Sequence, residues 1–283
     1  MNVKRAIAIP LAAIALSLLI IGAVQILSSH KEEAHAANTT PAISDLSFTC
    51  DIIGDNIDIS SSALSNGMLA IKTHDLDGTR HKVMVTKDGK SRAYDVSNGT
   101  YLFPLPFGDG EYSVKLFENL HDDEYKLMFQ TDVESSNEEN AYLTSNSLLV
   151  YSGDVIPEDT MSILESPSCG PNMICEYVES KLSYDFEKAR KIANESFHGL
   201  NGNESLSLNS GVCSDYCAIT CMMMRTNGVP CKISVGHCSA SDSLHCWITY
   251  LQDGKWIVMD PTMRDTNIGY DESSQTYEEL YSF

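Results

Sequence analysis

Three short strings near the C-terminus decide the fold of this chain: Gly211-Val212-Cys213, His245-Cys246-Trp247 and Asp260-Pro261-Thr262. In this order they supply a thiol, an imidazole and a carboxylate. A thiol becomes a good nucleophile when a base takes its proton, and a carboxylate can orient that base. The strings therefore predict one small unit that brings the three groups together.

The segment that starts at the first string is predicted to be a helix. Cys213 to Arg225 contains neither Gly nor Pro, and Asn227-Gly228 followed by Pro230 is typical of a helix C-terminus. Cys213 then lies in the first turn, where free backbone amides and the helix dipole stabilise a thiolate. We expect its pKa to fall below the roughly 8.5 of a free thiol.

Strands are predicted after this helix. One runs from Cys231 to His237, and two more, from His245 to Leu251 and from Trp256 to Asp260, flank a hairpin turn at Asp253-Gly254. A two-residue turn places Gln252 opposite Lys255, Trp247 opposite Asp260 and His245 opposite Thr262.

This register makes His245 and Asp260 diagonal neighbours on one face, about 7–8 Å apart at the backbone. The carboxylate can then accept a hydrogen bond from one ring nitrogen, and the other nitrogen is left to take the proton of Cys213. A one-residue bulge would reverse the parity.

The ordered motifs resemble the core of the transglutaminase-like superfamily. They are G-V-C at a helix start followed by Asp215-Tyr216, then Gly228-Val229-Pro230, H-x-W on a strand, and D-P-T after a strand with a Trp. The resemblance spans about residues 170 to 265, and Tyr184-Asp185 fits the usual approach to the nucleophile.

The resemblance implies a papain-like α+β domain in an exported or membrane-anchored, bacterial-type member of the superfamily. It implies Cys213 as nucleophile, His245 as general base and acid, and Asp260 as the residue that orients His245. The backbone amide of Cys213 is the one oxyanion donor that we name. No cofactor is implied, and calcium dependence is not carried over because no EF-hand-like acidic loop occurs.

Other residues near the motifs have simpler interpretations. Cys217, Cys221 and Cys231 replace the family's small apolar residues and are expected in the core, since Cys is often buried. Asp215 suits a helix N-terminus, and Trp247 and Trp256 suit a core or a cleft wall. His237 is an alternative base, although it lacks the following Trp and the hairpin partner.

The nine cysteines also raise the questions of zinc and of disulfides. Structural zinc sites usually show pairs such as C-x2-C, which do not occur here, so no metal site is predicted. If Cys213 is a free nucleophile, the other eight cysteines are enough for four disulfide bridges. Cys169 and Cys175 flank a Gly-Pro turn and are the expected local pair.

Residues 1–36 are expected to be a signal peptide or a signal anchor. Lys4 and Arg5 precede an uncharged apolar run of 22 residues, Ala6 to Leu27, which is long enough to span a bilayer. Ala34-His35-Ala36 offers a cleavage site. Positively charged residues that flank an apolar segment stay on the cytoplasmic side. The residues that follow this segment are therefore expected outside the cytoplasmic membrane, either anchored or secreted.

The net charge of the chain limits the classes of partner that it is expected to bind. The chain carries a net charge of −20, and residues 1–36 carry +1, so the remainder is strongly acidic. Such a surface repels phosphates, which excludes nucleic acid as an expected partner.

Residues 46–134 contain short β-rich segments separated by turn signals. This pattern predicts an antiparallel β-sandwich of immunoglobulin-like type, serving as a spacer or a binding domain. Turn signals at Asp88-Gly89, Asn98-Gly99 and Asp109-Gly110 separate the expected strands, which are 68–73, 82–86, 92–96, 111–118 and 125–133. Ser135 to Asn140 is a polar stretch typical of a linker.

The sequence thus predicts an α+β protein with a membrane or signal segment, a β-sandwich, and a transglutaminase-like domain over residues 150–283. The expected chemistry is thiol acyl transfer on carboxamide or peptide carbonyls of protein substrates. Two alternatives stay open: a cysteine protease or amidase of the same fold, and a surface binding or scaffold module without turnover.

Overall fold

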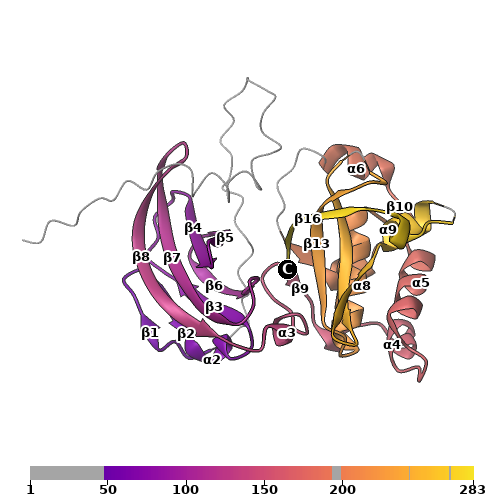
Figure 1. The fold of residues 1–283 in the computed structure, drawn as a ribbon, viewed down its shortest axis with the longest axis horizontal. Helices are drawn as coiled ribbons and strands as arrows, with labels where there is room; N and C mark the ends of the chain where they lie inside the picture. Colours follow the sequence, from indigo (N-terminus) through magenta and orange to yellow (C-terminus); the bar gives the residue numbers. More distant parts are fainter. Residues whose placement is uncertain (1–47, 193–198, 242, 268) are drawn as a thin grey trace, which may run out of the picture. The chain divides into compact units, whose positions relative to one another are not determined.

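The structure is a computed structural model that describes residues 48–192, 199–241, 243–267 and 269–283 (Figure 1). The chain divides into two compact units, Met1–Ala141 and Tyr142–Phe283. The predicted signal or anchor segment, 1–36, lies outside the described residues. Within the described ranges, no helix is both long enough and apolar enough to cross a bilayer.

Two antiparallel four-stranded sheets build the first unit, with strand orders β1-β2-β3-β6 and β5-β4-β7-β8. The elements are β1 (Ile52–Ile53), β2 (Ile57–Ser60), α2 (Ser61–Leu64), β3 (Met68–Thr73), β4 (His81–Lys87), β5 (Lys90–Val96), β6 (Gly99–Pro104), β7 (Gly110–His121), β8 (Glu124–Ser135) and α3 (Glu138–Ala141).

The two sheets of this unit face each other across an aromatic core. Tyr94 of β5 stacks on Phe103 of β6 with ring centroids 4.1 Å apart, and its hydroxyl donates to the carbonyl of Pro104 at 3.0 Å. On β7, alternate residues such as Tyr112 and Val114 are fully buried, as the alternating pattern predicts. Both faces that meet in the core are therefore apolar, which holds the sheets together.

The sequence reasoning missed β1, β2 and β6. It assigned Asn98-Gly99 only to a turn, but β6 begins at Gly99. Here the chain leaves β5 in one sheet and enters β6 in the other. A short strand directly after such a crossing has little room for the alternation that a sequence pattern needs.

The second unit mixes helices and strands around a four-stranded antiparallel sheet of order β15-β14-β13-β16. Its elements are β9 (Leu149–Val150), η1 (Gly153–Val155), α4 (Glu158–Leu164), α5 (Pro171–Lys181), β10 (Ser183–Tyr184), α6 (Phe186–Ile192), β11 (Leu200–Asn201), α7 (Gly202–Leu206), β12 (Ser210–Gly211), α8 (Cys213–Thr226), β13 (Cys231–Cys238), β14 (His245–Gln252), β15 (Lys255–Met259), α9 (Pro261–Thr266), η2 (Glu272–Ser274) and β16 (Tyr277–Ser282). The α+β fold that the sequence predicts is confirmed.

Helix α8 is the core of this unit and packs against β13 and β14 (Figure 1). All its residues from Asp215 to Arg225 are buried, including Cys217 and Cys221, as expected for core cysteines. It ends where the sequence predicts, because Gly228 takes a positive φ of 75° that suits the residue after a helix.

The hairpin of β14 and β15 has the predicted turn. Asp253 and Gly254 take φ values of 52° and 71°, as a two-residue hairpin turn requires, and the ladder runs without a bulge from Gln252↔Lys255 to Ile248↔Met259. The pairing of His245 with Thr262 is wrong. Pro261 lacks an N–H and favours the first turn of a helix, so the chain turns into α9 there.

Strand β16, which the sequence reasoning did not predict, closes the other side of the sheet. It pairs with β13 so that Tyr277 lies opposite Cys238. The two backbones approach closely at Gly236, where an added Cβ would lie 2.0 Å from the carbonyl oxygen of Glu278. Glycine at this position therefore lets β16 reach the sheet.

All nine cysteines lie in the described residues, and none forms a disulfide. The expected Cys169–Cys175 bridge is therefore wrong. Pro171 begins α5, which places Cys175 on the buried side of that helix, where its thiol donates to Glu179 at 3.1 Å. Cys169 stays outside the helix.

Candidate active site

Cys213 is the first residue of α8 and is half-buried. The turn before it is tight, because an added Cβ at Gly211 would come within 2.7 Å of Cβ of Asp215. The carboxylate of Asp215 accepts a hydrogen bond from the Val212 amide at 2.9 Å and one from Lys188 Nζ at 2.6 Å. Asp215 thus caps the helix that carries the thiol, in line with its simpler interpretation.

The residues that lead into Cys213 are fixed by a short parallel pair. Strand β12, Ser210–Gly211, pairs with β10, Ser183–Tyr184, and the amide of Asp185 donates to the carbonyl of Gly211 at 2.8 Å. This pair joins Tyr184-Asp185, noted in the sequence for its position, directly to the backbone in front of the thiol.

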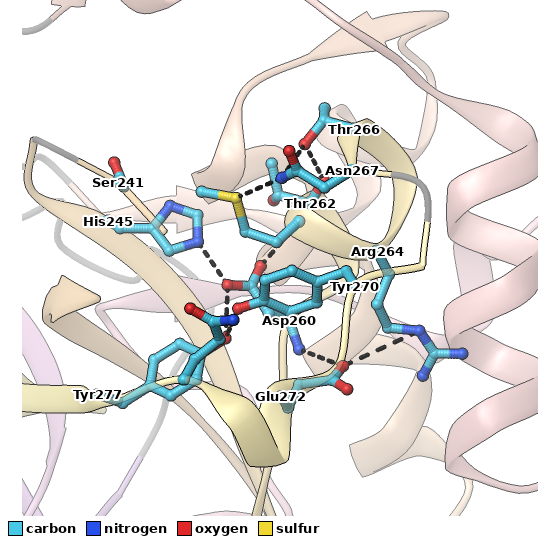
Figure 2. A network of polar contacts seen from close by, with 12 residues as sticks. Ser241, His245, Asp260, Thr262, Arg264, Thr266, Asn267, Tyr270, Glu272 and Tyr277 are labelled. Atoms are coloured by element: carbon cyan, nitrogen blue, oxygen red, sulfur yellow. Dashed lines mark hydrogen bonds and ion pairs between the residues drawn. The ribbon is translucent and has the colours of Figure 1, made fainter. Parts of the chain in front are cut away.

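His245 and Asp260 form a buried pair, although Asp260 lies beyond the end of the ladder. Nε2 of His245 and Oδ2 of Asp260 are 2.7 Å apart, and the two residues are 4% and 0% exposed (Figure 2). Because Nε2 is engaged, Nδ1 is the nitrogen left for another partner. The structure thus brings these two residues into contact, although Asp260 is not in the ladder as the register argument expected.

The thiol of Cys213 belongs to the same group of interacting side chains. Its pKa lies well below the ordinary thiol value, with the hydrogen bond from the Cys246 side chain as the largest cause. Burial raises the pKa of the thiol, whereas the hydrogen bond and the positive charge of His245 lower it further. These contacts therefore favour the thiolate over the thiol.

The imidazole of His245 is correspondingly basic. Burial lowers its pKa, but the hydrogen bonds and negative charges of Asp260 and Cys213 outweigh burial and raise the pKa to about 10. A low thiol pKa and a high imidazole pKa together describe a thiolate–imidazolium ion pair at neutral pH.

Sequence reasoning missed the part played by Cys246. This residue follows His245 in the H-C-W string, and both its thiol and its backbone amide interact with the Cys213 sulfur. Its own pKa is raised well above the ordinary value, first by the hydrogen bond to Cys213 and then by burial. Cys246 therefore stays protonated and can donate. Nothing in its spacing distinguishes it from a core cysteine.

The Asp260 carboxylate is satisfied on both oxygens (Figure 2). Oδ1 accepts from the amide of Met263 at 3.1 Å, which caps α9. Oδ2 accepts from His245 and also from the hydroxyl of Tyr277 at 3.0 Å. Tyr270 in turn hydrogen-bonds to the Tyr277 hydroxyl. Neither tyrosine was singled out from the sequence, because both lie after the last recognisable motif.

His237, the alternative base, is exposed on β13, where its backbone pairs with Glu278. The pairing with a buried carboxylate belongs to His245 instead.

Cys238, His245 and Asp260 place ligand-type atoms within 4.8 Å of one another. Nε2 of His245 and Oδ2 of Asp260, however, stand 2.7 Å apart, the distance of a hydrogen bond with a proton between them. Two ligands of one tetrahedral zinc ion would stand about 3.3 Å apart at normal bond lengths. The arrangement therefore has the geometry of an acid–base pair.

Comparison with known proteins agrees with the motifs. Residues 156–261, all within the second unit, match the family model described as the transglutaminase-like superfamily. No curated protein matches the chain.

Two solved structures are similar at low identity. A TGase structure has 14% identity and a TM-score of 0.33, over 56% of this chain and 46% of that chain. A candidate cysteine protease from Cytophaga hutchinsonii has 12% identity and a TM-score of 0.29, over 76% of this chain and 69% of that chain. The chain thus spans less than half the length of the TGase structure.

We predict that iodoacetamide at about pH 6 alkylates Cys213 before any other cysteine. A free thiol with a pKa of roughly 8.5 is less than about 1% ionised there, whereas the lowered pKa of Cys213 gives this sulfur a larger thiolate fraction. Peptide mapping by mass spectrometry reads the order of labelling. His245→Ala should slow the labelling, because the stabilising imidazolium is removed. Earlier labelling of Cys217 or Cys231 would contradict the assignment.

We predict that Asp260→Asn lowers turnover by about 10²–10⁴-fold while the fold is kept. Both carboxylate oxygens accept hydrogen bonds, and an amide has one accepting oxygen, so the variant must give up either the Met263 bond or the His245 bond. Steady-state kinetics and thermal melting measure the two effects. Normal melting with near-normal turnover would remove Asp260 from this role.

Proposed function

With residues 156–261 as a transglutaminase-like superfamily domain, we propose that the protein is a thiol acyltransferase acting on carboxamide or peptide carbonyls of protein substrates. Cys213 is the nucleophile, His245 the general base and acid, and Asp260 the residue that orients His245. The observation that carries the proposal is the buried 2.7 Å bond between His245 and Asp260, joined to a thiol of lowered pKa at a helix N-terminus.

In the first half of the proposed reaction, the thiolate of Cys213 attacks the carbonyl carbon. The backbone amide of Cys213, among the helical amides without an intrahelical partner, donates to the oxyanion. The carbon–nitrogen bond then breaks, and the leaving amine takes the proton that His245 carries. A thioester on Cys213 remains.

In the second half, an amine attacks the thioester and His245 accepts its proton. The carbon–sulfur bond breaks, the thiolate is restored, and a new amide leaves. Water in place of the amine gives hydrolysis. The net charge of −20 supports a cationic acceptor such as a lysine side chain, because an acidic surface attracts it.

We predict that the wild-type protein incorporates a dansylated primary amine into a glutamine-bearing protein and that Cys213→Ala does not. In-gel fluorescence and mass spectrometry of the acceptor measure the incorporation. Cys217→Ala is the matched control, since that cysteine is fully buried one helical turn later and takes no part in the reaction.

Two results would contradict acyl transfer to amines. Release of new N-termini from a peptide library without amine incorporation would make the protein a hydrolase. Neither activity, together with an unreactive Cys213, would make it a binding module.

We propose an immunoglobulin-like architecture for the first unit, with a role as a spacer or a binding domain. The orders β2-β3-β6 and β5-β4-β7-β8 correspond to strands A-B-E and C′-C-F-G of such sandwiches. No cluster of nucleophile, base and carboxylate was recognised in its sequence, which supports a role outside the chemistry.

We also propose that the protein acts outside the cytoplasmic membrane, held by residues 6–27 or released after cleavage near Ala36. The support is the apolar run of 22 residues behind Lys4 and Arg5. In cell fractionation, the intact chain should sediment with membranes and resist extraction by high salt. A mature protein in the medium that begins near Ala37 would show cleavage, and an intact chain in the soluble cytoplasmic fraction would contradict the proposal.

A further inference from the structure

The Asp260 carboxylate is contacted from a segment that lies beyond the family match, which ends at residue 261. Strand β16 pairs with β13, and its first residue, Tyr277, reaches Oδ2 of Asp260 with its hydroxyl at 3.0 Å. Tyr270 lies in the chain between α9 and η2 and hydrogen-bonds to the same hydroxyl. Figure 2 shows both tyrosines beside the carboxylate.

Chemistry fixes the direction of these hydrogen bonds. An ionised carboxylate only accepts, so Tyr277 must donate to Asp260. The proton of Tyr277 is then used, and Tyr270 must donate to the oxygen of Tyr277. Both hydroxyls keep their protons at neutral pH: burial and the charge of Asp260 raise the pKa of Tyr277, and burial above all raises the pKa of Tyr270 to about 12.

The ring of Tyr277 is fixed independently of its hydroxyl. It packs on Trp247 with ring centroids 4.9 Å apart, and Trp247 is almost completely buried. Backbone pairing with Cys238 holds the strand at the same point. The position of the Tyr277 hydroxyl is therefore fixed without any contribution from the carboxylate. A donor held rigidly in this way can orient the group to which it donates.

We propose that Tyr277 is a positioning residue that holds Oδ2 of Asp260 against Nε2 of His245, with Tyr270 orienting the Tyr277 hydroxyl. The proposal rests on the proposed function, in which His245 serves as base and acid. The hydroxyl restrains the oxygen that His245 uses, while the Met263 amide restrains only Oδ1.

The charge on His245 depends on where Oδ2 of Asp260 is held. Within the part of the chain that the structure describes, the groups that titrate or carry charge around its ring are Cys213, Cys238, Asp260 and the Tyr277 hydroxyl. Without the hydroxyl, Oδ2 is free to turn from the ring, so the imidazolium loses part of the stabilisation that Asp260 supplies. Both the proton affinity of His245 and the rate should then fall.

Tyr277→Phe tests this, because it removes the hydroxyl and keeps the ring on Trp247. We expect kcat to fall about tenfold, a part of the 10²–10⁴-fold that a positioned general base contributes, with KM unchanged. NMR titration of the His245 ring should give a pKa lower by about half a unit to one unit. Tyr270→Phe should shift both quantities in the same direction by less.

Tyr151→Phe is the matched control. Its hydroxyl donates to the carbonyl of Leu143 at 3.2 Å, within the same unit but outside this network, so its loss should leave kcat and the His245 titration unchanged. Melting temperatures of all three variants separate a loss of stability from a loss of positioning.

The proposal is overturned if Tyr277→Phe leaves the His245 titration unchanged or raises its pKa, or if Tyr151→Phe lowers the pKa equally. The titration needs no substrate, so it reports on Tyr277 even if no acyl transfer is found. Absence of turnover in the wild type would overturn the proposed function alone.

Discussion

The hydrogen bond between His245 and Asp260 is the interaction on which the rest of the site depends. Both groups are buried, and burial of an unpaired charge is costly enough that a protein normally neutralises it. Here the carboxylate accepts hydrogen bonds on both oxygens, from His245, Met263 and Tyr277. The imidazole can therefore hold a proton next to the Cys213 thiolate.

This constraint explains how three elements of the second unit are used. Helix α8 supplies the thiol at its positive end, β14 supplies the imidazole, and the junction of β15 and α9 supplies the carboxylate as the cap of a helix. Strand β16 reaches the sheet only because Gly236 lets the two backbones approach. Its position brings a further donor to the carboxylate.

The sequence predicted the parts of the site that depend on local rules. The start and end of α8 and the turn at Asp253-Gly254 follow from glycine and helix-end chemistry, and the hairpin register follows from that turn. It did not predict that Pro261 ends the strand, nor the contacts of Cys246 and Tyr277. Those contacts join residues far apart in the chain, which single-sequence periodicity does not record.

The most direct test of the account is the ionisation of Cys213, followed by the ultraviolet absorbance of the thiolate as the pH is raised. The difference between wild type and Cys213→Ala isolates this sulfur from the other eight cysteines. We expect it to ionise well below the ordinary thiol range and to return toward that range in His245→Ala. Ionisation near roughly 8.5 in the wild type would contradict the ion pair.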